Sequence, residues 1–126
     1  MMDKEQLDFV FNVIPLSFRD IVLDMGCGSG SILNALAEKS GCNGIGIDQL
    51  CRTTINFENK NIRYFEENID DIEKFNLNPT VTLLVDSIYF SRDPEKLIRY
   101  LCHIKNNRIY LFYSQYLFDN DIADKG

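Results

Sequence analysis

Three aspartates stand at the ends of short apolar runs that favour β-strands: Asp24, Asp48 and Asp86. The carboxyl ends of parallel strands share one edge of a sheet, and open α/β sheets bind their ligands outside that edge. If the three runs form neighbouring parallel strands, the three carboxylates converge on one rim. Such a rim attracts a cationic ligand and opposes a phosphate ester.

Glycines follow the first aspartate at alternate positions, at Gly26, Gly28 and Gly30. Glycine allows a sharp backbone turn and lets the main chain come close to a ligand, where a side chain would intrude. The turn lies between the apolar run at residues 21–23 and an amphipathic pattern at residues 31–39. This order of strand, glycine turn and helix predicts a nucleotide-type ligand at the turn.

Dinucleotides and S-adenosylmethionine both bind turns of this kind, and charge separates the two ligands. A pyrophosphate favours helix N-terminal amides without an adjacent carboxylate, whereas S-adenosylmethionine carries a sulfonium and an ammonium. The dinucleotide fingerprint also places a small residue three positions after its second glycine, which is Ser31, while the third glycine here is Gly30. The sequence therefore favours the sulfonium cofactor and keeps a nicotinamide dinucleotide as the alternative.

Asp48 has two compatible interpretations. An acid at the end of a second strand can accept both ribose hydroxyls of an adenosine. An aspartate there can also cap a helix that begins at Gln49. Because Ile45 and Ile47 place Asp48 at a strand terminus on the ligand edge, we expect it to bind ribose.

The elements that must position these residues alternate between strands and helices. Strands are expected over residues 21–23, 44–47, 62–65, 81–85 and 108–113. Helices are expected over residues 3–14, 31–39, 49–57 and 69–75, and from Pro94 after a cap at Asp93. The inner stripe of the last helix is expected to contain Leu97, Ile98, Leu101 and Cys102. This alternation implies right-handed crossovers and a mostly parallel sheet with helices on both faces.

The size and charge of the chain exclude several classes of protein. Its 126 residues hold one domain. A net charge of −6 opposes binding to nucleic acid or anionic lipid, and no apolar run is long enough to span a membrane. The 4 cysteines and the single histidine lack the paired spacing of a zinc site. We therefore expect a cytoplasmic protein with free thiols and no metal.

Segments of the chain resemble motifs of class I S-adenosylmethionine-dependent methyltransferases. Residues 21–30 are similar to their motif I, and residues 44–48 are similar to their second motif. Residues 61–68 resemble the third-strand region, in which the family commonly has an aspartate that meets the adenine amino group; Asn68 occupies that position here. Residues 85–90 resemble the fourth-strand segment of small-molecule methyltransferases, so that the resemblance extends over residues 20–114.

The resemblance implies a Rossmann-like three-layer sandwich with strand order 3-2-1-4-5, lacking the sixth and seventh strands of the family. The cofactor site that it implies consists of Asp24, Gly26, Cys27, Gly28, Gly30, Asp48, Gln49, Glu67, Asn68, Ile69, Asp86 and Ser87. Methyl transfer needs alignment of donor and acceptor more than it needs a strong acid or base. Asp86 and Tyr89 lie nearest the expected methyl position and are the catalytic candidates, although core packing explains Tyr89 at least as well.

The function expected from these observations is transfer of a methyl group from S-adenosylmethionine to a small-molecule acceptor. Residues 86–89 differ from the motif that amino-group methyltransferases of DNA and of protein glutamine carry after the fourth strand. The alternatives are a module that binds S-adenosylmethionine or S-adenosylhomocysteine without turnover and, more distantly, an NAD-dependent oxidoreductase.

The end of the sequence at Gly126 precedes the family's last strands. We therefore expect residues 1–126 to be a truncated single domain. It would self-associate through the exposed edge of its fifth strand, because an open apolar edge pairs with other chains.

Overall fold

The computed structural model describes residues 4–27, 31–49, 61–85, 87–88 and 91–112. Its elements are α1 (Lys4–Val13), β1 (Ile21–Met25), α2 (Ser31–Ser40), β2 (Asn43–Asp48), β3 (Ile62–Glu66), η1 (Ile69–Phe75), β4 (Val81–Val85), α3 (Pro94–His103) and β5 (Arg108–Phe112). All five strands are parallel and follow the order β3-β2-β1-β4-β5. The predicted α/β class and strand order are confirmed. The helix predicted over residues 49–57 falls on residues 50–60, outside the described part of the chain.

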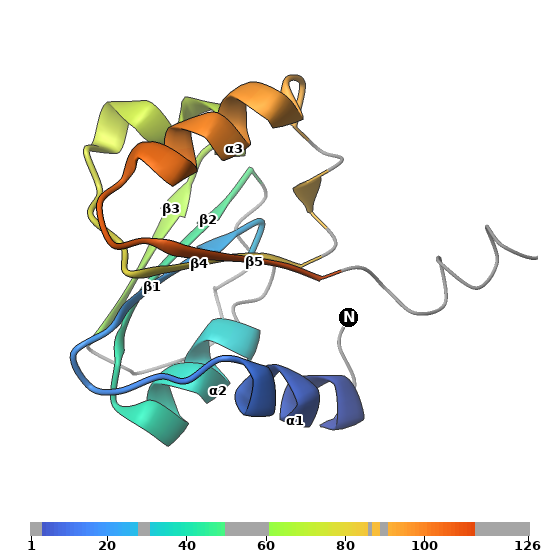
Figure 1. Cartoon of the computed structure of the whole chain (residues 1–126), viewed down its shortest axis with the longest axis vertical. Helices are drawn as coiled ribbons and strands as arrows, with labels where there is room; N and C mark the ends of the chain where they lie inside the picture. The colour runs from blue at the N-terminus through green and yellow to red at the C-terminus, as the bar shows by residue number, and fades with distance from the viewer. Residues whose placement is uncertain (1–3, 28–30, 50–60, 86, 89–90, 113–126) are drawn as a thin grey trace, which may run out of the picture.

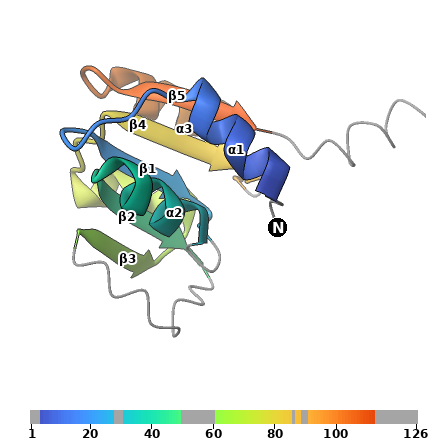
Figure 2. The same ribbon diagram turned by 90° about the horizontal axis from the view of Figure 1, so that it is seen from below.

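Helices cover both faces of the sheet, as the apolar strands require. The helices α1 and α2 lie on one face, and α3 and the 3-10 helix η1 lie on the other (Figure 1). Seen from below, α1 lies over β4 and β5, while α2 lies over β1 and β2 (Figure 2). The two faces bury separate apolar clusters, one around Leu33, Leu36 and Val81 and the other around Leu23, Leu84 and Leu101. Strand β4 is buried on both sides, which explains its nearly continuous apolar sequence.

The helix α3 begins at the predicted cap. The side chain of Asp93 accepts a hydrogen bond from the Lys96 N–H at 3.1 Å, and Pro94 occupies the first turn. Leu97 and Leu101 are buried, but Cys102 is exposed, so its predicted place in the inner stripe is wrong. The four-residue step from Leu97 to Leu101 follows the buried face, whereas the next position turns away from it.

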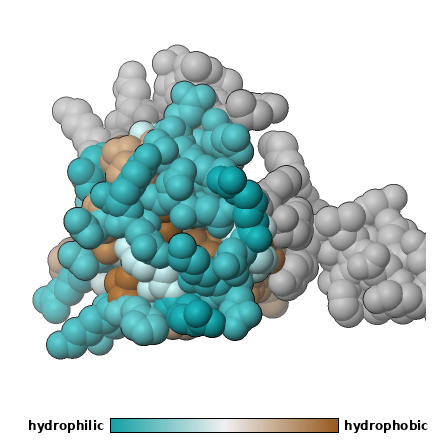
Figure 3. All heavy atoms as spheres, turned by 90° about the horizontal axis from the view of Figure 1, so that it is seen from above, coloured by the Kyte–Doolittle hydropathy of each residue, from teal (hydrophilic) through white to brown (hydrophobic). Residues whose placement is uncertain are grey.

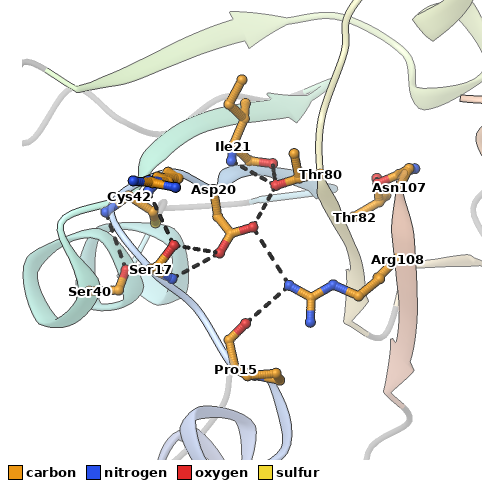
Figure 4. A network of polar contacts seen from close by, with 11 residues as sticks. Pro15, Ser17, Asp20, Ile21, Ser40, Cys42, Thr80, Thr82, Asn107 and Arg108 are labelled. Atoms are coloured by element: carbon orange, nitrogen blue, oxygen red, sulfur yellow. Dashed lines mark hydrogen bonds and ion pairs between the residues drawn. The ribbon is translucent and has the colours of Figure 1, made fainter. Parts of the chain in front are cut away.

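Polar side chains fasten the amino ends of β1, β4 and β5 to the loop after α1 (Figure 4). Asp20 accepts hydrogen bonds from the Ser17 N–H and the Thr80 hydroxyl, both at 2.8 Å, and its Oδ1 lies 3.6 Å from Arg108 Nη2. Arg108 also donates to the Pro15 carbonyl at 3.1 Å. Burial alone would raise the pKa of Asp20, but these hydrogen bonds and Arg108 outweigh it and hold the pKa below its usual value.

The outer surface is polar over most of the face that carries α3 and η1, with hydrophobic atoms visible in the gaps between polar side chains (Figure 3). No helix within the described ranges has the length and apolar character needed to cross a membrane. Among the described strands, β5 pairs with β4 alone, and its residue Leu111 is 43% exposed.

Candidate functional site

Asp24 lies within β1 and is buried in the sheet. It pairs in register with Gly46 of β2 and Leu83 of β4, and only 2% of its surface is exposed. Burial, and then the nearby charge of Asp48, raises the pKa of Asp24 to about 7. The expectation that Asp24 begins the loop after the strand is therefore wrong, because β1 continues to Met25. The effect of Asp48 on this pKa indicates that the two carboxyl groups lie near one another.

The turn after β1 is tied to the end of β2. The N–H groups of Gly26 and Cys27 both donate to the Ile47 carbonyl, at 2.6 Å and 3.1 Å. Gly26 has a φ of +81°, a conformation that side chains disfavour. A Cβ atom at Gly26 would lie only 2.8 Å from the Cβ of Ser87, so the turn also packs directly against the residues that follow β4. Glycine is required at this position on both counts.

Cys27 fills a space that Gly46 leaves above β2. A Cβ atom at Gly46 would lie 2.9 Å from Cys27 Sγ and 2.8 Å from a ring carbon of Tyr64. The absence of a side chain at Gly46 therefore allows the turn to lie down on the sheet beside Asp24. This role of Gly46 was not predicted from the sequence; the signal was the pair Gly44 and Gly46, which a strand's two-residue period places on one face.

Ser87 presents a buried hydroxyl at the end of β4. It is 2% exposed, and its Oγ has no hydrogen-bond partner in the described part of the chain. A buried hydroxyl without a partner costs about 1–3 kcal/mol, so such groups in native proteins usually await a ligand or water. Its contact with the glycine turn makes Ser87 a strong candidate for a ligand-binding group.

The end of β3 joins the same edge through its main chain. The Glu67 N–H donates to the Asp48 carbonyl at 2.9 Å, but the Glu67 carboxylate forms an ion pair with Lys74. The Oδ1 atom of Asn68 caps η1 by accepting from the Asp70 N–H at 2.9 Å. Ile69 is buried in the core. These three side chains therefore have structural contacts, and their predicted role in cofactor binding stays a prediction.

The structure thus brings part of the predicted site to one edge of the sheet. Asp24, Gly26, Cys27, Asp48 and Ser87 lie at the carboxyl ends of β1, β2 and β4. Gln49 is exposed next to Asp48. The other predicted positions lie outside the described residues: Gly28, Gly30, Asp86 and Tyr89. Within the described residues, no group of three His, Cys, Asp or Glu side chains could hold a metal ion.

The sequence profile of a family described as a methyltransferase domain matches residues 9–124. The chain belongs to this family, which confirms the resemblance seen in its motifs. No curated protein matches the sequence.

Solved structures of methyltransferases share the fold at low sequence identity. One is a methyltransferase from Geobacter sulfurreducens, described as S-adenosylmethionine-dependent and bound to S-adenosylhomocysteine. It is 19% identical to this chain with a TM-score of 0.69, and the match covers 87% of this chain and 48% of the Geobacter chain. A putative methyltransferase from Haloferax volcanii, in complex with the activator Trm112, is 17% identical with a TM-score of 0.64, over 94% and 65%. The plantazolicin methyltransferase BpumL, bound to a pentazolic desmethylPZN analog and S-adenosylhomocysteine, is 20% identical with a TM-score of 0.63, over 86% and 42%. This chain therefore spans 42% to 65% of the length of these structures.

Proposed function

We propose that the chain binds S-adenosylmethionine at the carboxyl ends of β1, β2 and β4, and forms the cofactor-binding part of a methyltransferase. The observation that carries this proposal is the buried carboxyl group of Asp24 beneath the glycine turn. No basic residue in the described part of the chain forms an ion pair with it. A cationic ligand would compensate the charge of Asp24, whereas a pyrophosphate would oppose it.

The residues present fit the cofactor in type and position. Asp48, at the end of β2, would accept the ribose hydroxyls. The hydroxyl of Ser87 would gain a partner in the methionine part, and Gly26 would allow close approach of the main chain. When bound, the cofactor would supply an electrophilic methyl group on its sulfonium, which an acceptor nucleophile would take in line with S-adenosylhomocysteine as the leaving group. Asp86 and Tyr89 stay the proposed residues that orient the acceptor.

A small molecule is the proposed acceptor, because a net charge of −6 works against a nucleic-acid substrate. A binding module without turnover is the second candidate.

Calorimetric titration with S-adenosylmethionine, S-adenosylhomocysteine and NAD tests the proposal. We expect both adenosyl ligands to bind and NAD to give no heat. Asp48→Ala should weaken binding at least about tenfold, since a charged hydrogen bond to ribose is lost. Asp71→Ala, which removes an exposed acid on η1, is the matched control and should bind as the wild type does. Binding of NAD alone, or equal affinity for Asp48→Ala and wild type, would overturn the proposal.

The open edge of β5 supports a second proposal, self-association of this chain. Leu111 exposes 43% of its surface on a strand that pairs with β4 alone among the described strands. Sedimentation velocity over a concentration series should show a dimer that Leu111→Lys abolishes. A monomer at every concentration would contradict self-association without affecting cofactor binding.

A further inference from the structure

A second cavity opens at the edge of the sheet opposite to the candidate cofactor site. It has a volume of about 570 Å³ and lies where β1, β2 and β3 begin, under the segment that follows η1. Cavities of roughly 300–1,000 Å³ are the usual size for one small organic ligand. None of the proposed cofactor-binding residues that the structure describes lines it.

The floor of the cavity is aromatic. Phe65 of β3 and Phe75 of η1 lie with their ring centroids 5.0 Å apart and their planes inclined at 43°. Both rings pack on the core and are half-buried, as is Leu77 beside them. The exposed parts of these side chains offer an apolar surface against which an aromatic ring can pack.

The polar residues that line the cavity, within the described part of the chain, are four carboxamides and one cation. The carboxamides belong to Asn43, Asn61, Asn76 and Asn78. The chain has 19 acidic residues, yet none of the described residues that line this cavity is acidic. A rim that combines amides with a positive charge and excludes carboxylates favours an anionic ligand with hydrogen-bonding oxygens.

Arg63 supplies the positive charge. It is exposed, and it forms no ion pair with any described residue, whereas Arg92, Arg99 and Arg108 each lie against a carboxylate. Arg63 and Phe65 are two positions apart on β3, so their side chains leave the same face of the sheet. A guanidinium in this position can bind the two oxygens of a carboxylate while the attached ring lies on Phe65.

We propose that this cavity binds a small aromatic carboxylate, with its ring on Phe65 and Phe75 and its carboxylate on Arg63. The ligand carries one negative charge, matching Arg63, the one cation among the described residues that line the cavity. This site is separate from the cofactor edge, where the carboxyl groups of Asp24 and Asp48 would repel the same anion.

The experiment is titration of the ¹⁵N-labelled full chain with 2-naphthoate, followed by two-dimensional NMR. Saturable shifts are expected at the amides of Arg63, Phe65, Phe75 and Asn76, with the amides of Gly26 and Cys27 unmoved. The neutral isostere 2-naphthalenemethanol should bind about tenfold more weakly, because it lacks the charged partner of Arg63.

Two variants keep the test specific. Arg63→Gln should weaken 2-naphthoate binding about tenfold, and Asn78→Asp should also weaken it by placing a carboxylate on the rim. Arg19→Gln, which removes an exposed arginine that does not line the cavity, is the matched control and should leave binding unchanged. All three variants should bind S-adenosylmethionine as the wild type does.

Three outcomes would overturn the proposal. The first is equal affinity of Arg63→Gln and wild type for 2-naphthoate. The second is a set of shifts centred on the glycine turn. The third is the absence of saturable binding, which would be expected if the cavity receives a segment of a protein partner instead of a small anion.

Discussion

The aspartates at the two ends of β1, the half-buried Asp20 and the buried Asp24, have opposite environments. At the amino end, Asp20 is surrounded by donors from Ser17, Thr80 and Arg108, and its pKa is lowered. At the carboxyl end, Asp24 is more deeply buried, is paired with no described cation, and has a pKa raised to about 7. At the amino end, the carboxylate of Asp20 has its hydrogen-bond donors and a cation within the protein. The carboxyl end leaves the carboxyl group of Asp24 without a described cation, and this contrast supports the proposal that a cationic ligand binds there.

The largest effect on stability and on cofactor binding is expected for Gly26→Ala, which adds a methyl group to the turn at the carboxyl end of β1. Gly26→Ala combines a left-handed backbone, costing about 1–2 kcal/mol, with an overlap against Ser87 that costs about 1–3 kcal/mol. We expect urea unfolding to show a loss of about 2–5 kcal/mol and calorimetry to show no S-adenosylmethionine binding.

Gly41→Ala is the matched control for this change. Gly41 has a similar φ of +75°, but its added Cβ would meet only Phe18, at an ordinary 3.6 Å. It should therefore lose only about 1 kcal/mol and keep full cofactor affinity. Equal loss of binding in both variants would show that the contact between Gly26 and Ser87 is unimportant.

Asp24→Asn should change how stability depends on pH. The folded pKa of Asp24, about 7, lies above its ordinary value of 3.8, so its contribution to stability is complete below pH 3.8 and is lost as the pH rises through 7. The wild type should therefore weaken over this range, and the Asp24→Asn variant should be about 2 kcal/mol more stable than the wild type at pH 8 in the absence of ligand. Unfolding curves at pH 5 and pH 8 test this, and the same variant should bind the cationic cofactor more weakly.

The contribution of Asp20, at the amino end of β1, to stability should depend on pH in the opposite direction. The pKa of Asp20 is lowered, so its contribution is present at neutral pH and is lost as the pH falls below 3.8. Asp20→Asn should cost about 1–2 kcal/mol at pH 7, and this difference should shrink in acid. Its affinity for S-adenosylmethionine should equal that of the wild type; a loss of affinity would contradict the assignment of this end to structure alone.

The smallest change in stability is expected for Ser87→Ala. The hydroxyl has no described partner, so its removal should leave the free energy of unfolding within about 0.5 kcal/mol of the wild type or raise it slightly. Affinity for S-adenosylmethionine should nevertheless fall about fivefold to tenfold, because the ligand loses a hydrogen bond. Unchanged affinity would remove Ser87 from the site.

The sequence predicted the arrangement of the elements better than the environment of the side chains. The five strands and the cap at Asp93 followed from local patterns of apolar residues and caps, and the strand order followed from the resemblance to a known family. The burial of Asp24 did not, because an acid after an apolar run suggests the end of a strand, and only pairing with β2 and β4 carries β1 on to Met25.

Contacts between distant segments also escaped prediction. The packing of Cys27 over Gly46 and the cavity around Arg63 depend on strand register, which single-sequence patterns do not specify. The residues around η1 were predicted as a short helix, but a 3-10 helix formed between Asn68 and the left-handed Asn76. Seven residues between two such caps leave little room for regular α-helical turns.

The missing side chain of Gly46 has a consequence for how mutational data on this protein would be understood. Any larger residue there must displace Cys27 or Tyr64, and the neighbouring turn would shift with it. A saturation library selected for function should therefore reject almost every substitution at position 46 while accepting several at Ile45. Such data alone would suggest that Gly46 takes part in binding or catalysis. Its contribution is instead to leave space for the side chains of Cys27 and Tyr64.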